Sequence, residues 1–334
     1  MITQVNQKWP RDRLLINYSI HNVCNYKCWY CFPGSNEGDH RWPDLDLVTQ
    51  NFLHLLKYYK DNLGKTKFQV NLLGGEPTLW PKLSTFVRNL KNELGDDISI
   101  MITTNGSRTV NWWETNGTLF DHVLISCHPK VVDATHVSAV ADILYEKNVH
   151  VDVAVLMDPT RWERTMEIIA QLKNSRRRWS IIASQIIHQN INYTADQTKY
   201  LKRYLKRFPN LFWYWRVNKE YNYKTTITHH TGKIQKIAKN YLLTNNLNHF
   251  QGWECNIGID NITVNFNGNL TGSCSQSLYK LDRVYNLYDA DFIQVFNPVL
   301  QPTICNKISC DCQHEYNTSK RALTTKRVIP IKHV

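Results

Sequence analysis

The sequence predicts an α/β protein built around a partial (β/α)6 barrel. Short runs rich in β-branched residues alternate with amphipathic helical segments through roughly the first 190 residues, which is the pattern of repeated βα units around a parallel sheet. The pattern occurs six times before it changes after Asn190. Six such units are fewer than the eight that close a full barrel.

The six expected strands and the helices between them follow in order along the chain. The strands are residues 14–20, 68–73, 98–103, 122–126, 150–156 and 180–187. Apolar side chains three and four residues apart indicate helices, and these are residues 47–62, 83–94, 134–147 and 162–173.

Beyond Asn190 the pattern predicts two further elements. Thr194 followed by Gln197 resembles a capping box that opens a helix running to about residue 208, with one apolar and one basic face. Residues 262–270 alternate at strand period around Asn267 and Gly268, which indicates a β-hairpin.

Length and cysteine content set the broad class. The chain has 334 residues and no run of about 18 apolar residues, so we expect a soluble protein without a membrane span. The polar first ten residues contain no secretory h-region, and we therefore expect a cytoplasmic protein. The chain contains nine cysteines. In a reducing compartment, closely spaced thiols are expected to bind metal or take part in chemistry rather than form disulfides.

The formal net charge of +12 is concentrated in two places. Residues 171–210 contain nine Lys or Arg and one acid, and residues 320–334 contain five Lys or Arg and no acid. With the aromatic run at residues 212–215, these basic segments could follow a phosphate backbone and stack on bases. Charge runs are more often solvated helix faces, and a strand rich in Trp and Tyr is more often core or a peptide-docking edge, so nucleic acid is the less favoured of the two interpretations.

Cys24, Cys28 and Cys31 stand directly after the first expected strand, where a loop at the mouth of a barrel would lie. Three thiolates within eight residues can converge on one metal centre, and soft sulfur ligands select iron–sulfur clusters or zinc. The fourth cysteine and the proline of a bacterial ferredoxin run are absent. A zinc site completed by a distant residue and ordinary core thiols both remain open at this point.

Three later strand ends carry motifs that agree with the cysteine spacing. They are Leu73-Gly74-Gly75-Glu76-Pro77, Thr103-Thr104-Asn105-Gly106 and Ser126-Cys127-His128-Pro129. Together with C-x3-C-x-aromatic-C, in which Tyr30 is the aromatic residue, they resemble the radical S-adenosylmethionine (radical SAM) superfamily in identity and order. This resemblance implies a [4Fe–4S] cluster on Cys24, Cys28 and Cys31 with one open iron.

The same resemblance implies contacts to S-adenosylmethionine. Gly74 and Gly75 allow close approach of backbone to a ligand, with Glu76 adding charge, although Gly-Gly-Glu-Pro also suits an ordinary strand-to-helix turn. The remaining candidates are expected to contact the carboxylate or ribose, or to serve as turn and cap residues. The full set of cofactor-binding candidates is Tyr30, Gly74, Gly75, Glu76, Pro77, Thr104, Asn105, Ser126 and His128. Cys127 is expected to be a buried small apolar residue rather than a ligand.

The resemblance to the radical SAM superfamily implies reductive cleavage of S-adenosylmethionine to methionine and a 5′-deoxyadenosyl radical. This radical abstracts a hydrogen atom from the substrate. An external electron donor is implied as a partner. No residue beyond the cluster ligands is identified as catalytic.

Five more cysteines occupy the last third of the chain, namely Cys255, Cys274, Cys305, Cys310 and Cys312. With the hairpin between the first two, they resemble the auxiliary-cluster domain of SPASM and twitch enzymes, which implies a second [4Fe–4S] cluster held by four of the five. A zinc site held by four thiolates is the alternative. The expected domains are a core at residues 1–190, a basic and aromatic connection at 191–250, and an auxiliary-cluster domain with a basic tail at 251–334.

The resemblance to auxiliary-cluster enzymes favours a peptide or protein side chain as substrate. The basic segments favour a nucleotide or nucleic-acid base as the alternative. A second alternative is a non-catalytic iron–sulfur or zinc protein that binds nucleic acid.

Overall fold

The computed structural model describes residues 1–6, 11–31, 34–38, 42–174, 179–186, 191–201 with the backbone of 202–207, 225–237, 242, 245–271, 284–310 and 318–323. They group into two compact units. The motif unit comprises Tyr18–Leu45 and Val70–Trp213, and the terminal unit comprises Met1–Asn17, Asp46–Gln69 and Tyr214–Val334. Two of the boundaries between the units fall within strands, so the chain passes from one unit to the other inside regular structure.

The expected α/β fold with a parallel sheet is confirmed in the motif unit. Its strands follow the order β2-β3-β4-β5-β6-β7, and the pairs β4–β5, β5–β6 and β6–β7 are parallel. The strands are β2 Arg13–Ser19, β3 Lys67–Leu73, β4 Ile98–Thr104, β5 His122–Cys127, β6 His150–Leu156 and β7 Ser180–Ser184. Each matches an expected strand to within a few residues.

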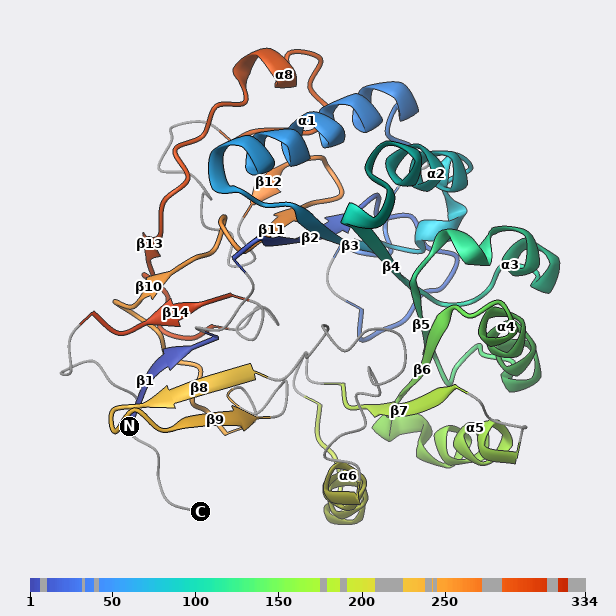
Figure 1. Cartoon of the computed structure of the whole chain (residues 1–334). Helices are drawn as coiled ribbons and strands as arrows, with labels where there is room; N and C mark the ends of the chain where they lie inside the picture. Colours follow the sequence, from blue (N-terminus) through green and yellow to red (C-terminus); the bar gives the residue numbers. More distant parts are fainter. Residues whose placement is uncertain are drawn as a thin grey trace. The chain divides into compact units, whose positions relative to one another are not determined.

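Helices of the motif unit cover one side of these strands (Figure 1). They are α2 Leu83–Leu94, α3 Val110–Asn116, α4 Ala134–Glu146 and α5 Trp162–Asn174. The motif unit also contains α6 Ala195–Arg207 and the short 3-10 helix η1 at Pro77–Leu79. On α2 the buried residues are Leu83, Phe86, Val87 and Leu90, the spacing that predicts an amphipathic helix. The expected capping box is present, because Gln197 accepts from the Thr194 N–H and Thr194 accepts from the Gln197 N–H.

Helix α3 is absent from the expected elements. It spans seven residues and buries only Trp113, so its sequence shows no apolar period. It begins at Thr109, whose hydroxyl accepts a hydrogen bond from the Trp112 N–H.

The terminal unit joins the first residues of the chain to the last ones in a six-stranded sheet of order β13-β10-β14-β1-β8-β9. Its strands are β1 Ile2–Val5, β8 Thr225–His229, β9 Ile234–Ile237, β10 Glu254–Cys255, β13 Thr303–Ile304 and β14 Lys320–Arg321. The unit also contains α1 Leu45–Leu63, of which residues from Asp46 belong to it, and α8 Phe292–Val295. The expected hairpin is confirmed as β11 Asn261–Val264 and β12 Leu270–Thr271, with Gly268 at φ 86° in its turn.

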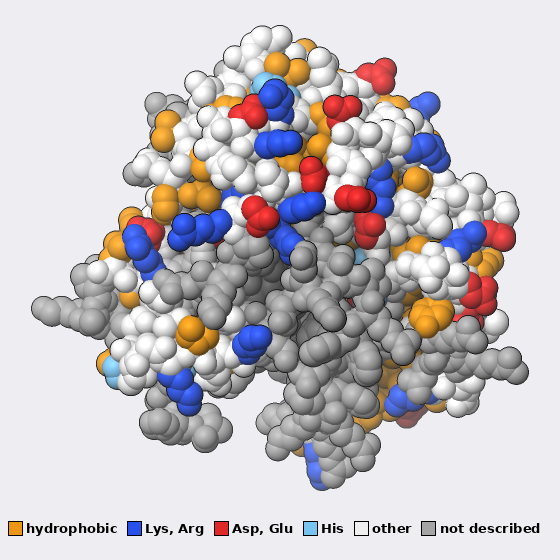
Figure 2. Space-filling view, in the orientation of Figure 1, with side chains coloured by type: hydrophobic (Ala, Val, Ile, Leu, Met, Phe, Trp, Pro, Cys, Tyr) orange, Lys and Arg blue, Asp and Glu red, His pale blue; other side chains and the backbone are white. Residues whose placement is uncertain are grey.

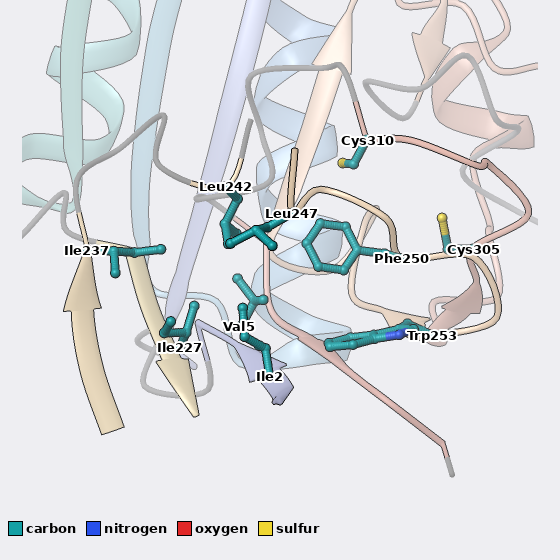
Figure 3. Packing of buried hydrophobic residues seen from close by; sticks show 10 residues of the cluster. All are labelled: Ile2, Val5, Ile227, Ile237, Leu242, Leu247, Phe250, Trp253, Cys305 and Cys310. Atoms are coloured by element: carbon teal, nitrogen blue, oxygen red, sulfur yellow. The ribbon is translucent and has the colours of Figure 1, made fainter. Parts of the chain in front are cut away.

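One hydrophobic cluster packs against this sheet (Figure 3). Its members come from β1, β8, β9, the segment before β10 and the segment after β13. They are Ile2, Val5, Ile227, Ile237, Leu242, Leu247, Phe250, Trp253, Cys305 and Cys310. Because its first members lie at the start of the chain and its last ones near the end, this core requires both ends of the sequence. The predicted division at residues 190 and 250 remains a prediction.

Most of the predicted basic surface lies outside the described residues, including residues 176–178 and the aromatic run 212–215. On the face seen in Figure 2, the described Lys and Arg side chains are interspersed with Asp and Glu. Within the described part of the chain, no helix combines the length and apolar character needed to cross a membrane.

Candidate functional site

The cysteine loop leaves the carboxyl end of β2, as the sequence predicts. A turn brings the Cys31 N–H to the Cys28 carbonyl at 3.1 Å, and the Tyr26 N–H donates to the Cys24 sulfur at 3.3 Å. All three thiols are half-buried. Burial raises the pKa of Cys24 and raises that of Cys28 to about 11. Thiols this hard to ionise become thiolates when a cation compensates the charge, so the donor set fits a metal centre.

A mononuclear zinc site would need the three thiols close together. Three thiolates on one zinc, each at about 2.3 Å, place their sulfur atoms about 3.8 Å apart. Among the described residues, the three-ligand groups with all donor atoms within 4.8 Å of one another include no cysteine. The choice of an iron–sulfur cluster over zinc rests on the motifs that accompany the cysteines.

Gly74 and Gly75 bring the end of β3 against the segment that leads into the cysteine loop. The Gly75 N–H donates to the His21 carbonyl and the Glu76 N–H to the Val23 carbonyl, both at 2.8 Å. A Cβ atom on Gly75 would lie 2.0 Å from the Val23 oxygen, and Gly74 has φ 140°. The glycines thus permit a close approach of backbone to backbone.

Glu76 is fully buried, and its carboxylate accepts hydrogen bonds on both oxygens. Its Oε1 accepts from the Thr78 N–H, the Thr78 hydroxyl at 2.6 Å and the Thr104 hydroxyl at 2.7 Å, while Oε2 accepts from the Asn105 N–H at 2.6 Å. Burial raises the pKa of Glu76 and these four bonds oppose the rise. The residue is the N-cap of the 3-10 helix η1, with Pro77 at its first position, and the predicted cofactor contacts of this segment remain predictions.

The loop after β4 is tied to the cysteine loop through Asn25. Asn105 Nδ2 donates to Asn25 Oδ1 at 2.8 Å and lies 4.0 Å from the Cys24 sulfur, while Asn25 Nδ2 donates to the Ser107 hydroxyl at 2.9 Å. The Thr104 hydroxyl also accepts from the Gly106 N–H. Thr104 and Asn105 therefore make hydrogen bonds typical of turn residues, and their predicted contacts to S-adenosylmethionine remain predictions.

His128 connects the loop after β5 to the cysteine loop. Its Nδ1 lies 3.2 Å from the Cys28 sulfur and 3.0 Å from the Tyr30 hydroxyl, and its ring stacks on Tyr30 with centroids 5.8 Å apart. Burial lowers the pKa of His128 to about 4, so the ring is neutral near pH 7. Ser126 is half-buried on β5, and Cys127 is fully buried, as expected for an apolar residue.

Three residues that support the site have no sequence signal of their own. Asn25 is the link described above. His136 lies on α4, and its Nε2 is 2.9 Å from the Gly106 carbonyl oxygen and 3.1 Å from the Arg108 carbonyl oxygen. Arg108 Nε donates a hydrogen bond to the Thr78 carbonyl at 2.9 Å. Their partners come from other elements, so only the folded chain identifies them.

Three of the five C-terminal cysteines are described, and all three are buried in the terminal unit. Strand β10 pairs with β13 so that Cys255 lies opposite Thr303, two residues before Cys305. The Cys310 N–H donates to the Asn248 carbonyl, and Asn248 Nδ2 donates back to the Cys310 carbonyl. The thiols interact electrostatically, since burial first, and then Cys310 and Cys305, raise the pKa of Cys255. Cys274 and Cys312 lie outside the described residues.

A model of the radical SAM superfamily matches residues 18–184, half of the chain. The chain belongs to the radical SAM superfamily. The match begins at the end of β2 and ends with β7, so it contains all four motif loops. The predicted enzyme class is confirmed, and the radical SAM family implies a [4Fe–4S] cluster and S-adenosylmethionine.

Named relatives share parts of this radical SAM core. An S-adenosylmethionine-dependent nucleotide dehydratase of Fibrobacter sp. (strain UWH6) is 34% identical over 94 residues, which cover 28% of this chain and 28% of the relative. A GTP 3′,8-cyclase of Microcystis aeruginosa is 34% identical over 91 residues, 27% of each chain. The chain thus matches little more than a quarter of the length of these relatives.

Among solved structures, native anSMEcpe with bound AdoMet has a TM-score of 0.51 at 16% identity, covering 85% of this chain and 81% of that one. At this identity the likeness concerns the fold. It extends well beyond the residues that the radical SAM model matches.

Proposed function

We propose that Cys24, Cys28 and Cys31 hold a [4Fe–4S] cluster whose open iron binds S-adenosylmethionine. The observation that carries this proposal is the set of hydrogen bonds joining all four motif loops. Asn25 links to Asn105, Glu76 links to Thr104 and Asn105, and His128 lies against Cys28. When bound, this cofactor pair supplies reductive cleavage to methionine and a 5′-deoxyadenosyl radical.

We also propose which groups of the motif loops contact S-adenosylmethionine. The N–H groups of Gly75 and Glu76 are bonded to residues 21 and 23, so the carbonyl oxygens of Gly74 and Gly75 are the groups left to accept from the methionyl ammonium. Glu76 and Pro77 shape the turn that presents these carbonyls. Ser126, half-buried at the end of β5, and Tyr30 with His128 beside it are proposed to line the cofactor side of the site.

We also propose an auxiliary cluster in the terminal unit, with Cys255, Cys305 and Cys310 among its ligands and Cys274 or Cys312 completing the set. Buried thiols that raise one another's pKa ionise together only if a cation compensates them. The surrounding architecture is proposed to be the partial (β/α)6 barrel with a twitch/SPASM-like domain.

For the substrate, we propose hydrogen abstraction from a peptide or protein side chain, because the auxiliary-cluster hairpin is the feature that points to a substrate class. A nucleotide or nucleic-acid base is the second candidate, and the names of the two relatives favour it. Incubating reduced enzyme with deuterated peptide or nucleotide libraries separates them. Transfer of deuterium into 5′-deoxyadenosine identifies the class from which hydrogen is taken.

Formation of 5′-deoxyadenosine tests the cofactor site itself. Anaerobically reconstituted, dithionite-reduced protein should release it from S-adenosylmethionine, and Cys28→Ala should reduce its formation by more than the roughly 10- to 100-fold that loss of an outer-shell partner of a metal ligand costs. Cys127→Ala is the matched control, because Cys127 is a buried thiol outside the ligand set, and its yield should stay close to that of the wild type. Equal loss in both variants, or activity retained by Cys28→Ala, would refute the assignment.

A further inference from the structure

A second group of metal-binding side chains lies at the opposite ends of the strands. His122, His150 and Asp152 offer ligand atoms that all lie within 4.8 Å of one another. His122 pairs with His150 in the register of β5 and β6, and Asp152 follows two residues later on β6. Adjacent parallel positions and a spacing of two place all three side chains on one face of the sheet.

These side chains are well separated from the motif loops. His122 is the first residue of β5, and His128 follows that strand at its carboxyl end. At about 3.3 Å per residue, six residues correspond to roughly 20 Å along the strand. The group therefore belongs to no site described above.

The distances agree with coordination of one small ion. Asp152 Oδ2 lies 3.0 Å from His122 Nε2 and 3.4 Å from His150 Nε2, and the two rings meet edge to face with centroids 4.5 Å apart. Ligand atoms at about 2.0–2.1 Å from a tetrahedral zinc ion are about 3.3–3.4 Å from each other. Small movements of the side chains would thus place an ion at bonding distance from all three.

The surroundings resemble the outer shell of a metal site. Ser180 on β7 is paired with Asp152 in the register of β6 and β7. Its hydroxyl is hydrogen-bonded to Asp152 Oδ1, whereas the histidines lie near Oδ2. Such a contact orients a ligating carboxylate. Within the described part of the chain, no Lys or Arg forms an ion pair with Asp152, whose side chain is 4% exposed. Its partners are the two histidines and Ser180, so a divalent ion would supply the compensating positive charge when the imidazoles are neutral.

We propose that His122, His150 and Asp152 bind one divalent transition-metal ion of the Zn²⁺ class, with water in the fourth position. Two imidazoles and one carboxylate suit Zn²⁺ better than Mg²⁺ or Ca²⁺, which prefer oxygen ligands. The ion joins β5 to β6 at the amino-terminal ends of the strands, where side chains of barrel proteins serve stability rather than chemistry. Its role is structural.

The test measures zinc in protein whose cysteines already hold their clusters. One equivalent of Zn²⁺ is added anaerobically, unbound ion is removed by gel filtration, and zinc is counted by mass spectrometry. Wild type should retain one zinc per chain, whose X-ray absorption shows nitrogen and oxygen ligands without sulfur. His122→Gln and Asp152→Asn should lose this zinc, and His229→Gln, a control on β8 of the terminal unit, should retain it.

Ser180→Ala keeps all three ligands. It therefore tests the site even if the ligand variants fail to fold. Loss of its hydrogen bond should weaken zinc affinity about 10- to 100-fold. Zinc in wild type that does not exceed zinc in Asp152→Asn, or zinc bound through sulfur, would overturn the proposal and leave a hydrogen-bonded His–Asp–His group. Because no cysteine takes part, failure here leaves the cofactor site untouched.

Discussion

At the scale of single residues, the motif loops depend on contacts too short for any larger side chain. Gly75 and Glu76 donate to the backbone of residues 21 and 23, and this pairing extends the β2–β3 contact into the loops. The sequence predicts close approach of Gly74 and Gly75 to a ligand, which remains a prediction. The close approach to a neighbouring backbone could not be predicted, because the identity of the facing strand is a property of the fold.

Gly75→Ala should prevent this pairing. Its Cβ would lie 2.0 Å from the Val23 oxygen, and backbone must move to relieve the overlap. We expect the free energy of unfolding to fall by about 2–4 kcal/mol, the range of severe local overpacking and lost hydrogen bonds, and 5′-deoxyadenosine formation to fall by roughly tenfold or more.

The control for this variant is Gly64→Ala in the terminal unit, where an added Cβ meets nothing within 4 Å. Its positive φ alone should cost about 1–2 kcal/mol. Urea denaturation followed by circular dichroism measures both, and a Gly75→Ala protein with native stability and activity would contradict the assigned contact.

Glu76 shows the same limit of prediction. Its position in the motif predicts a charge for the cofactor, which remains a prediction, and its carboxylate also accepts hydrogen bonds from Thr78, Thr104 and Asn105. Thr78 is close in sequence and could be inferred as a capping partner. The contacts from β4 and its loop are long-range, so no local pattern contains them.

At the scale of elements, strands and helices with a clear apolar period are predicted almost to the residue. The expected 83–94 and 150–156 agree in full with α2 and β6. The expected strand at 180–187 ends as β7 at Ser184, since residues 185 and 186 lie outside the ladder with β6. Helix α3 shows the opposite case, because seven residues are too few to display a period of 3.6.

The start of α4 provides a test at this scale. Asp133 is its N-cap, and its Oδ1 accepts from the Thr135 N–H at 2.9 Å. Asp133→Ala removes that acceptor and should lower the free energy of unfolding by about 1 kcal/mol. Asp133→Ser keeps a capping oxygen and should restore most of the loss in thermal denaturation. If alanine and serine behave alike, the cap contributes nothing measurable.

At the scale of the whole chain, the terminal unit assembles segments that are far apart in sequence. Asp260 connects three of them: its carbonyl accepts from the Leu15 N–H, and its carboxylate meets Lys65 at 3.5 Å and the Ser319 N–H at 3.2 Å. Lys65 and Asp260 are both nearly inaccessible. Changes of pattern along the chain, on which the predicted domain boundaries rest, contain no information about such pairings.

Breaking this buried ion pair should be costly. Burial lowers the pKa of Lys65, and Asp260 opposes that shift, so each charge depends on the other. Lys65→Met leaves Asp260 unpaired and should cost about 3–5 kcal/mol of unfolding free energy. The double variant Lys65→Met with Asp260→Asn should recover a large part of it. Chemical denaturation of both singles and the double measures the coupling, and additive effects would show that the two charges act independently.

The hydrogen bonds from Glu76, Asn25 and His128 have a consequence for cofactor recruitment. They tie the four loops together through groups of the protein itself, and we expect these contacts to order the loops before the cofactor binds. Binding then immobilises few additional side chains, and less of the interaction energy goes into ordering them. Such a preorganised site favours fast capture of S-adenosylmethionine with little change in backbone protection, which hydrogen exchange with and without the cofactor would reveal.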